Sequence, residues 1–283
     1  AAGHRPVPDP SGRVANAVLD YVLIVPMGLG IAGAGHCHGD RLHDTGCHWP
    51  YLFSYARNSL WLVRPRMEKG ELKDTCINGS SEMVTNLSSG IITFLFNLAM
   101  MHFAGEDGVA AITIIQYSQF LLNALFMGFS QGVSPVISFN YGSRNQEQLR
   151  QVFKTSLLFT LATSAATFLL AQLGGSIVVG IFAEPGSPVY GLARHGFTIF
   201  AFSFLFSGFT IFASALFTAL SDGRISAVIS FVRTFGLIIT SLMVLPFLIG
   251  VDGVWLAIPI AELGGLLLSI HYMRKYRSTY HYA

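Results

Sequence analysis

Residues 81–103 read SEMVTNLSSGIITFLFNLAMMHF, and this stretch decides the fold class. It is long and apolar enough to cross a bilayer, because hydrocarbon about 30 Å thick requires roughly 20 mainly apolar residues in a helix. Its polar residues are spaced by three or four positions, which places them on one helix face. They are Glu82, Asn86, Ser89, Thr93 and Asn97. Such a face is costly against lipid, so the stretch predicts a membrane helix with one side toward protein or water.

Long apolar stretches recur along the rest of the chain. Apolar residues make up 52% of the 283 positions and charged residues only 11%, with a mean hydropathy of +0.54. An ordinary soluble domain carries about 25% charged residues, so this chain lacks the polar surface of such a domain. The stretches long enough to span a bilayer are residues 16–34, 81–103, 109–139, 152–182, 196–220, 225–249 and 253–273. We therefore predict an all-α polytopic membrane protein.

Features of an enzyme or of a nucleic-acid-binding protein do not stand out. The net charge is only +2, which gives no argument for a nucleic-acid partner. We see no nucleophile beside a base and no phosphate-binding loop, so we predict no catalytic function. Three cysteines, Cys37, Cys47 and Cys76, give no disulfide framework.

Basic residues collect in alternate connections between the predicted spans. Twelve Lys and Arg residues follow this pattern, whereas the intervening connections hold only Arg194. The twelve are Arg57, Arg64, Arg66, Lys69, Lys73, Arg144, Arg150, Lys154, Arg224, Arg274, Lys275 and Arg277. Cytoplasmic loops of membrane proteins carry such an excess. We predict a cytoplasmic linker at 57–77, a six-helix lobe at 78–273 and a cytoplasmic tail at 274–283, in a bacterial inner membrane.

Two other spans repeat the polar face of residues 81–103. In the span at 109–139 the polar residues are Gln116, Gln119, Asn123, Ser130 and Ser134, and in the span at 196–220 they are Ser203, Ser207, Thr210, Ser214 and Thr218. Three polar faces predict a shared cavity. Its predicted lining is Asn86, Ser89, Thr93, Asn97, Gln116, Asn123, Ser203 and Ser207. Ser and Thr serve equally well in close helix packing, so packing stays an alternative for them.

Three ionisable residues lie at membrane depth. An ionised side chain at mid-bilayer costs about 2.5 to 3.5 kcal/mol on insertion scales, so each needs a partner or a function. Glu82 lies near the start of its span, where a solvated carboxylate at headgroup level is the alternative to a functional one. Arg233 and Glu262 lie deeper in their spans, and the sequence leaves open whether they form a pair.

Four motifs carry a resemblance to a known family. They are residues 78–84 (NGSSEMV), 95–97 (LFN), 105–111 (GEDGVAA) and 128–142 (GFSQGVSPVISFNYG). Together they resemble the multidrug and toxic compound extrusion (MATE) family. Residues 78 to the end resemble its second six-helix lobe, and residues 16–34 resemble the fifth helix of its first lobe. Family members have twelve helices in two lobes, so the resemblance implies a fragment that lacks helices one to four.

The resemblance implies a secondary active transporter that exports drugs or organic cations in exchange for H⁺ or Na⁺. Glu82 matches the acidic residue of the family's seventh helix, which is implicated in ion coupling. The tenth helix of many members carries an Asp, but residues 196–220 contain no acidic residue, so the identity of the ion stays open. The implied partners are small amphipathic or cationic substrates and the lipid bilayer. The resemblance implies no cofactor besides the ion, and it implies that the complete protein is a monomer. A lipid-linked sugar flippase of the same broad fold is an alternative, and it should show more charged cavity residues.

Residues 35–49, GHCHGDRLHDTGCHW, do not fit this pattern. The His and Cys residues at 36–48 have the chemistry of zinc ligands, so a membrane-bound metalloprotein is a second alternative. The stretch stands, however, where the resemblance requires a sixth helix. One back-translation, regrouped after its first base, reads AIATVIGYTIPAVI, an apolar span. We therefore predict a compensated frameshift across 35–56 with no specific metal site, and we regard residues 1–15 as poorly defined.

Overall fold

The described part of the chain is built from helices. The computed structural model describes residues 69–282, and between residues 69 and 85 it describes only some of the side chains. The helices are α3 (Lys69–Gly142), α4 (Gln146–Phe182), α5 (Pro188–Phe200), α6 (Phe204–Ala219), α7 (Gly223–Phe231), α8 (Ile239–Ile249), α9 (Val251–Lys275) and α10 (Arg277–Tyr280). A 3-10 segment, η1 (Ala201–Ser203), joins α5 to α6, and a π-helical segment, η2 (Val232–Ile238), joins α7 to α8. The all-α prediction is confirmed for these residues, whereas the predictions for 1–15, 16–34 and 35–56 lie outside them.

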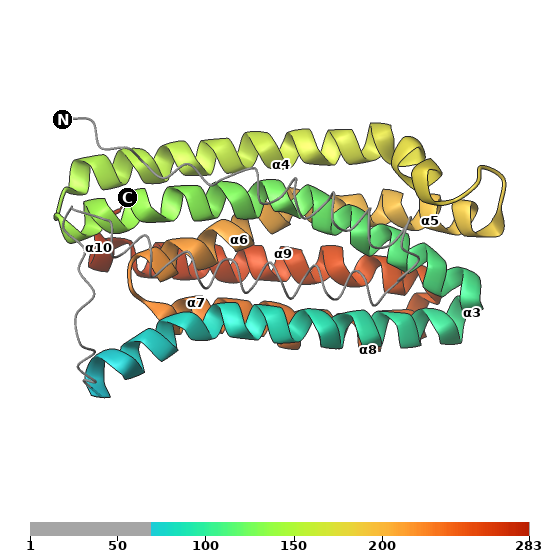
Figure 1. Ribbon diagram of the computed structural model, residues 1–283, viewed down its shortest axis with the longest axis horizontal. Coiled ribbons are helices and arrows are strands. Elements are labelled where there is room, and N and C mark those ends of the chain that lie inside the picture. Colours follow the sequence, from blue (N-terminus) through green and yellow to red (C-terminus); the bar gives the residue numbers. More distant parts are fainter. Residues whose placement is uncertain (1–68, 283) are drawn as a thin grey trace, which may run out of the picture. The chain divides into compact units, whose positions relative to one another are not determined.

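α3 is one long helix with a break at Gly105. This residue has φ 67° and ψ −154°, a conformation essentially restricted to glycine. Figure 1 shows α3 running from left to right along the bottom of the view, reversing at the right end and returning to the left above α9. Residues 86–142 form the first of five candidate spans, and their length of roughly 85 Å is enough for two crossings of about 30 Å. The predicted spans at 81–103 and 109–139 are therefore the two halves of α3.

The same turn recurs between α8 and α9. Gly250 has φ 64° and ψ −140°, close to the values at Gly105, and each glycine opens a G-x-D-G-V sequence. The second glycine of each motif is crowded. A Cβ atom on Gly108 would lie 2.6 Å from the nearest side-chain atom, and one on Gly253 would overlap the backbone of α8. Glycine is thus required twice in each turn, once for the backbone conformation and once for the close approach of the chain.

Side-chain caps fix where several helices begin. Asn145 caps α4, Ser187 caps α5 and Asp222 caps α7, each accepting a hydrogen bond from the backbone N–H three residues further on. Caps satisfy N–H groups that have no partner inside the helix. Because of them, α4 and α5 begin earlier than the apolar stretches at 152–182 and 196–220 predicted. α3 is already helical at Lys69, the first described residue, inside the stretch predicted to be a linker.

Aromatic side chains and small residues build the core between the helices. Trp255 of α9 is fully buried, as are Phe197 of α5 and Phe204 of α6. Gly196 of α5 lies directly against the Trp255 ring, so a Cβ there would be only 2.6 Å from it. Close helix contact through small residues is typical of membrane proteins.

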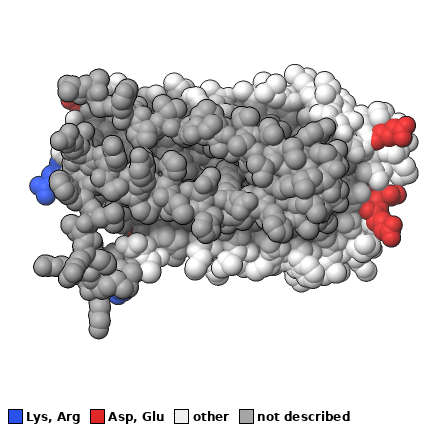
Figure 2. All heavy atoms as spheres, viewed as in Figure 1, with Lys and Arg blue, Asp and Glu red and all other residues white. Residues whose placement is uncertain are grey.

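The outside of the described helices is apolar between two charged ends. Large hydrophobic side chains are exposed along α3, α4 and α8, among them Phe120, Leu173 and Phe247. Figure 2 shows basic side chains at the left end and a group of acidic side chains at the right end, with uncharged atoms where the surface between them is visible. Exposed apolar surface of this extent belongs in lipid rather than in water. The chain is a multi-pass membrane protein.

Candidate functional site

A buried ion pair links two helical segments. Glu262 lies on α9 with 1% of its side chain exposed, and Arg233 lies on η2 with 18% exposed. The Arg233 Nη2 atom donates a hydrogen bond of 2.7 Å to Glu262 Oε1, and its Nε atom donates one of 2.9 Å to the same oxygen. A buried charge needs such a partner. The two charges that the sequence left unassigned are therefore each other's partner.

The other oxygen of the Glu262 carboxylate is held by α6. Thr210 Oγ1 lies 2.8 Å from Glu262 Oε2 and 2.9 Å from the backbone oxygen of Ser207. The hydroxyl has one proton to donate, and the carboxylate is the stronger acceptor. Ser207 in turn donates a long hydrogen bond of 3.4 Å to Asn123 Oδ1 on α3. A polar chain therefore runs from α9 through α6 to the second half of α3.

Two local features accommodate the pair. Gly265 lies one turn after Glu262, and a Cβ there would lie 3.1 Å from Thr210 Cγ2 and 3.4 Å from Arg233 Cγ. A larger side chain would push these residues away from the carboxylate. Arg233 itself lies in the π-helical segment η2, and such segments are rare and frequently occur at functional sites.

The predicted cavity residues differ in burial. Three on the first half of α3 are exposed: Asn86, Ser89 and Thr93. Three are half-buried: Asn97, Gln116 and Asn123. Two are buried in the bundle: Ser203 and Ser207. The backbone of Glu82 belongs to α3, but its side chain lies outside the described residues, and the roles assigned to all nine stay predictions.

Two of these residues carry buried polar atoms without a partner. Asn97 Oδ1 and Ser203 Oγ make no hydrogen bond within the part of the chain that the structure describes. A buried polar atom left without a hydrogen bond costs about 1 to 3 kcal/mol, so such atoms are natural contacts for water or a ligand.

A second polar cluster joins α6 to α7. Ser214 Oγ lies 2.8 Å from Ser226 Oγ and 3.1 Å from Ser230 Oγ, and Thr218 donates a hydrogen bond of 2.8 Å to Ser226. Hydroxyls spaced by four on both helices meet here. The sequence contains this signal, because residues 226 and 230 repeat the spacing of 214 and 218, but the pairing of the helices was needed to see it. At Ser214 and Thr218 the packing alternative therefore accounts for the contacts.

Among the side chains that the structure describes, no three His, Cys, Asp or Glu residues are grouped so that they could hold a metal ion. One exposed pair, His195 Nε2 and Asp252 Oδ1, lies 2.8 Å apart and joins α5 to the start of α9. The His and Cys residues at 36–48 lie outside the described residues. Both the zinc alternative and the frameshift explanation stay predictions.

Known proteins share both the sequence and the fold. The family described as MatE matches residues 83–243, more than half of the chain. The multidrug export protein MepA of Staphylococcus saprophyticus subsp. saprophyticus is 22% identical over 258 residues, which cover 88% of this chain and 55% of that protein. The probable multidrug resistance protein YoeA of Bacillus subtilis is 24% identical over 133 residues, which cover 46% of this chain and 29% of YoeA. The chain thus spans about half the length of MepA.

Solved structures of transporters have the same arrangement of helices. A crystal structure of MATE in complex with MaL6 covers 97% of the chain with a TM-score of 0.87 and 21% identity, and the match covers 62% of that protein. A MOP superfamily transporter from Pyrococcus furiosus, described as having a binding pocket of reverse polarity that suggests a different function, has a TM-score of 0.86 and 21% identity, covering 95% of this chain and 61% of its own. These similarities confirm the resemblance of the motifs at 78–142. The chain belongs to the MatE family.

Proposed function

We propose that the chain forms part of a transporter that exports drugs or organic cations in exchange for H⁺ or Na⁺. The observation that carries this proposal is the exposed polar face on the first half of α3, formed by Asn86, Ser89 and Thr93. Amide and hydroxyl groups on an otherwise apolar span suit contact with an amphipathic ligand. The names of the relatives, multidrug export and multidrug resistance proteins, support the same activity.

In this proposal Glu82 couples the inward movement of the ion to the outward movement of the substrate. It lies one turn before Asn86 on α3, at the start of the polar face. Its carboxylate is neutralised either by the inward-moving ion or by the outward-moving organic cation, so the two positive species compete for one group. Linkage then requires that binding of one weakens binding of the other, which is the basis of exchange. No cofactor besides the ion enters this scheme.

The proposed setting is the inner membrane of a bacterium, with the tail after α9 in the cytoplasm. Arg144 between α3 and α4, Arg224 in the first turn of α7 and the basic residues of the last turn of α9 support this orientation. The proposed partners are small amphipathic or cationic compounds and the lipid bilayer, and the complete protein acts as a monomer. The proposal includes neither nucleic-acid binding nor catalysis.

A flippase for lipid-linked sugars is favoured less. Such substrates carry phosphates, which basic side chains would bind. The polar face at Asn86, Ser89, Thr93 and Asn97 consists of amides and hydroxyls. The described basic residue at membrane depth, Arg233, is already paired with Glu262.

The decisive experiment measures dye efflux by the transporter with its upstream helices restored and residues 35–56 in frame. Ethidium loss from energised cells without their own drug pumps is followed under an imposed proton gradient and then under a sodium gradient. We expect efflux with one gradient and its loss in Glu82→Gln, while Glu106→Gln, which removes an exposed carboxylate at the Gly105 turn, keeps it. Gradient-driven efflux that is unchanged in Glu82→Gln would reject the coupling role, and no efflux from inserted protein would reject the export proposal.

The metalloprotein alternative is tested separately by measuring zinc in the purified protein. A frameshifted segment should bind no specific metal. Stoichiometric zinc that is lost in both His36→Ala and Cys47→Ala would support a metal site instead, and the nucleotide sequence of residues 35–56 shows directly whether the codons regroup into an apolar span.

A further inference from the structure

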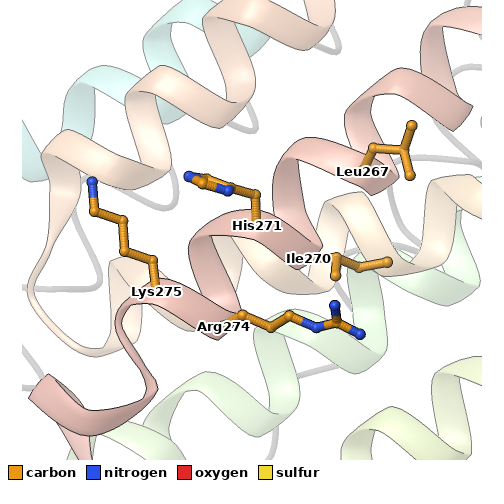
Figure 3. Close-up of a pocket in the computed structure, with 5 residues that line it drawn as sticks. All are labelled: Leu267, Ile270, His271, Arg274 and Lys275. Carbon is orange, nitrogen blue, oxygen red and sulfur yellow. The ribbon is translucent and has the colours of Figure 1, made fainter.

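A hollow lies beside the final turns of α9. It has a volume of about 510 Å³ and is lined by Leu267, Ile270, His271, Arg274 and Lys275. Figure 3 shows His271 and Lys275 on one side of the helix and Ile270 and Arg274 on the other. The lining changes along the helix axis, because the first two residues are apolar and the last three carry nitrogen donors. The hollow therefore presents an apolar half and a cationic half in a fixed order.

None of the residues that line the cationic half is acidic. Arg274 and Lys275 are exposed, and neither forms an ion pair within the described residues. Asp222, an acidic residue at the same end of the bundle, accepts a hydrogen bond from Tyr280 instead. The Lys275 ammonium lies 5.6 Å from the centre of the Tyr276 ring, a contact that leaves its N–H groups available to an anion.

The apolar half faces the lipid-exposed band of the protein. Leu267 is 63% exposed, and it lies two turns before Arg274, toward the middle of the span. The final turn of α9, which contains Arg274 and Lys275, coincides with the end of the apolar exterior. A molecule bound there would place an anionic group at the membrane surface and a hydrocarbon chain beside Leu267 and Ile270.

We propose that this hollow binds the headgroup of an anionic phospholipid. Basic pockets at the membrane surface attract anionic headgroups, and each nearby Lys or Arg strengthens that attraction. A free phosphate ion would use the cationic half alone, whereas a phospholipid uses both halves, so the apolar lining favours the lipid. The site depends only on insertion of the chain in a membrane and goes beyond the export proposal.

The complete chain is placed in nanodiscs that contain equal amounts of phosphatidylglycerol and phosphatidylcholine. Native mass spectrometry then measures how much of each lipid stays bound when the protein is released from the nanodiscs. We expect retained phosphatidylglycerol to exceed phosphatidylcholine, and the ratio to fall about tenfold in Arg274→Gln/Lys275→Gln. The matched control Arg224→Gln/Arg277→Gln removes the same charge from exposed residues of the same end that do not line the hollow, and it should keep the ratio. Equal losses in both double variants would overturn the proposal, because general surface charge would then explain the preference.

Two further measurements separate a lipid from a free anion. Leu267→Asn should lower phosphatidylglycerol retention without removing a charge, since the Leu267 side chain lines the apolar half and is 63% exposed. A large excess of inorganic phosphate should leave most of the bound lipid in place. Complete displacement by phosphate, or retention unchanged in Leu267→Asn, would overturn a phospholipid site. Circular dichroism of each variant checks that the helices are intact.

Discussion

Arg233 and Glu262 are 29 positions apart in the sequence, yet the guanidinium of one lies 2.7 Å from the carboxylate of the other in the interior of the bundle. Thr210 on α6 completes the arrangement by donating to the second carboxylate oxygen. Three segments, α6, η2 and α9, are thereby tied together at one point. The pair differs from an ordinary surface salt bridge because separation of the helices would leave the buried Glu262 carboxylate without its partner.

Arg233 and Glu262 are buried to different extents, so removing one charge should cost more unfolding free energy than removing the other. Arg233→Gln strands the carboxylate of Glu262, which is 1% exposed, and should cost about 3 to 5 kcal/mol. Glu262→Gln should cost less, because the Arg233 side chain is 18% exposed and can extend toward water. The double variant should recover most of the loss. Unfolding in mixed micelles by titration with SDS measures these free energies, and additive losses in the double variant would contradict a coupled pair.

The backbone conformation at Gly105 predicts that replacing this glycine lowers the stability of the protein, even though there is room for a side chain. No atom lies within 4 Å of a Cβ built on Gly105, so Gly105→Ala has room, yet the residue has φ 67°. Alanine there should cost about 1 to 3 kcal/mol of unfolding free energy. Gly90→Ala in the same helix also has open space and an ordinary backbone, so it should be neutral or stabilising. If the two variants have the same stability in the SDS titration, the strained turn does not govern the fold.

Each pattern in the sequence predicts only the structural property that it measures. Hydropathy reports burial in lipid, so it located the long apolar helices of the described residues, including the two halves of α3. It did not locate the starts of α4 and α5, because Asn145 and Ser187 extend these helices beyond the apolar band. The π-helical geometry of η2 also escaped prediction, since it depends on packing rather than on residue type.

The site was predictable only in part for a similar reason. Periodicity shows which residues share a helix face but not which neighbour that face meets. Ser207 belongs to one of the predicted polar faces, whereas its burial against Asn123 and the Thr210–Glu262 contact depend on how the helices pair. Charge at membrane depth showed that Arg233 and Glu262 each needed a partner. Only the three-dimensional arrangement identified that partner.

Packing around Trp255 predicts a second glycine effect with a steric origin. A Cβ on Gly196 would lie 2.6 Å from the Trp255 ring, which is fully buried and cannot move without opening the core. Gly196→Ala should therefore lower the free energy of unfolding by about 1 to 3 kcal/mol. Gly191→Ala, on the same helix with no atom within 4 Å, is the matched control and should show no loss. Equal stability of the two variants would mean that α5 shifts freely against α9.

The contact between Tyr280 and Asp222 predicts a dependence on alkaline pH. Tyr280 Oη donates a hydrogen bond of 2.5 Å to Asp222 Oδ2, while Asp222 Oδ1 caps α7. Burial, and then the hydrogen bond to Asp222, raise the pKa of Tyr280 above its ordinary value of 10.0. The unfolded chain therefore loses this proton first as the pH rises, so the stabilisation is complete below about pH 10 and declines above it.

Melting of the helices by circular dichroism between about pH 7 and pH 11 tests this dependence. Tyr280→Phe should lower stability by about 1 kcal/mol at neutral pH, because Asp222 loses a donor, and should decline less steeply above pH 10. Burial also raises the pKa of Tyr282, so part of the slope should remain until Tyr282→Phe is added. Tyr117→Phe, whose ring is 63% exposed on α3, should follow the parent protein. A Tyr280→Phe profile parallel to the parent at every pH would show that this phenol does not couple protonation to folding.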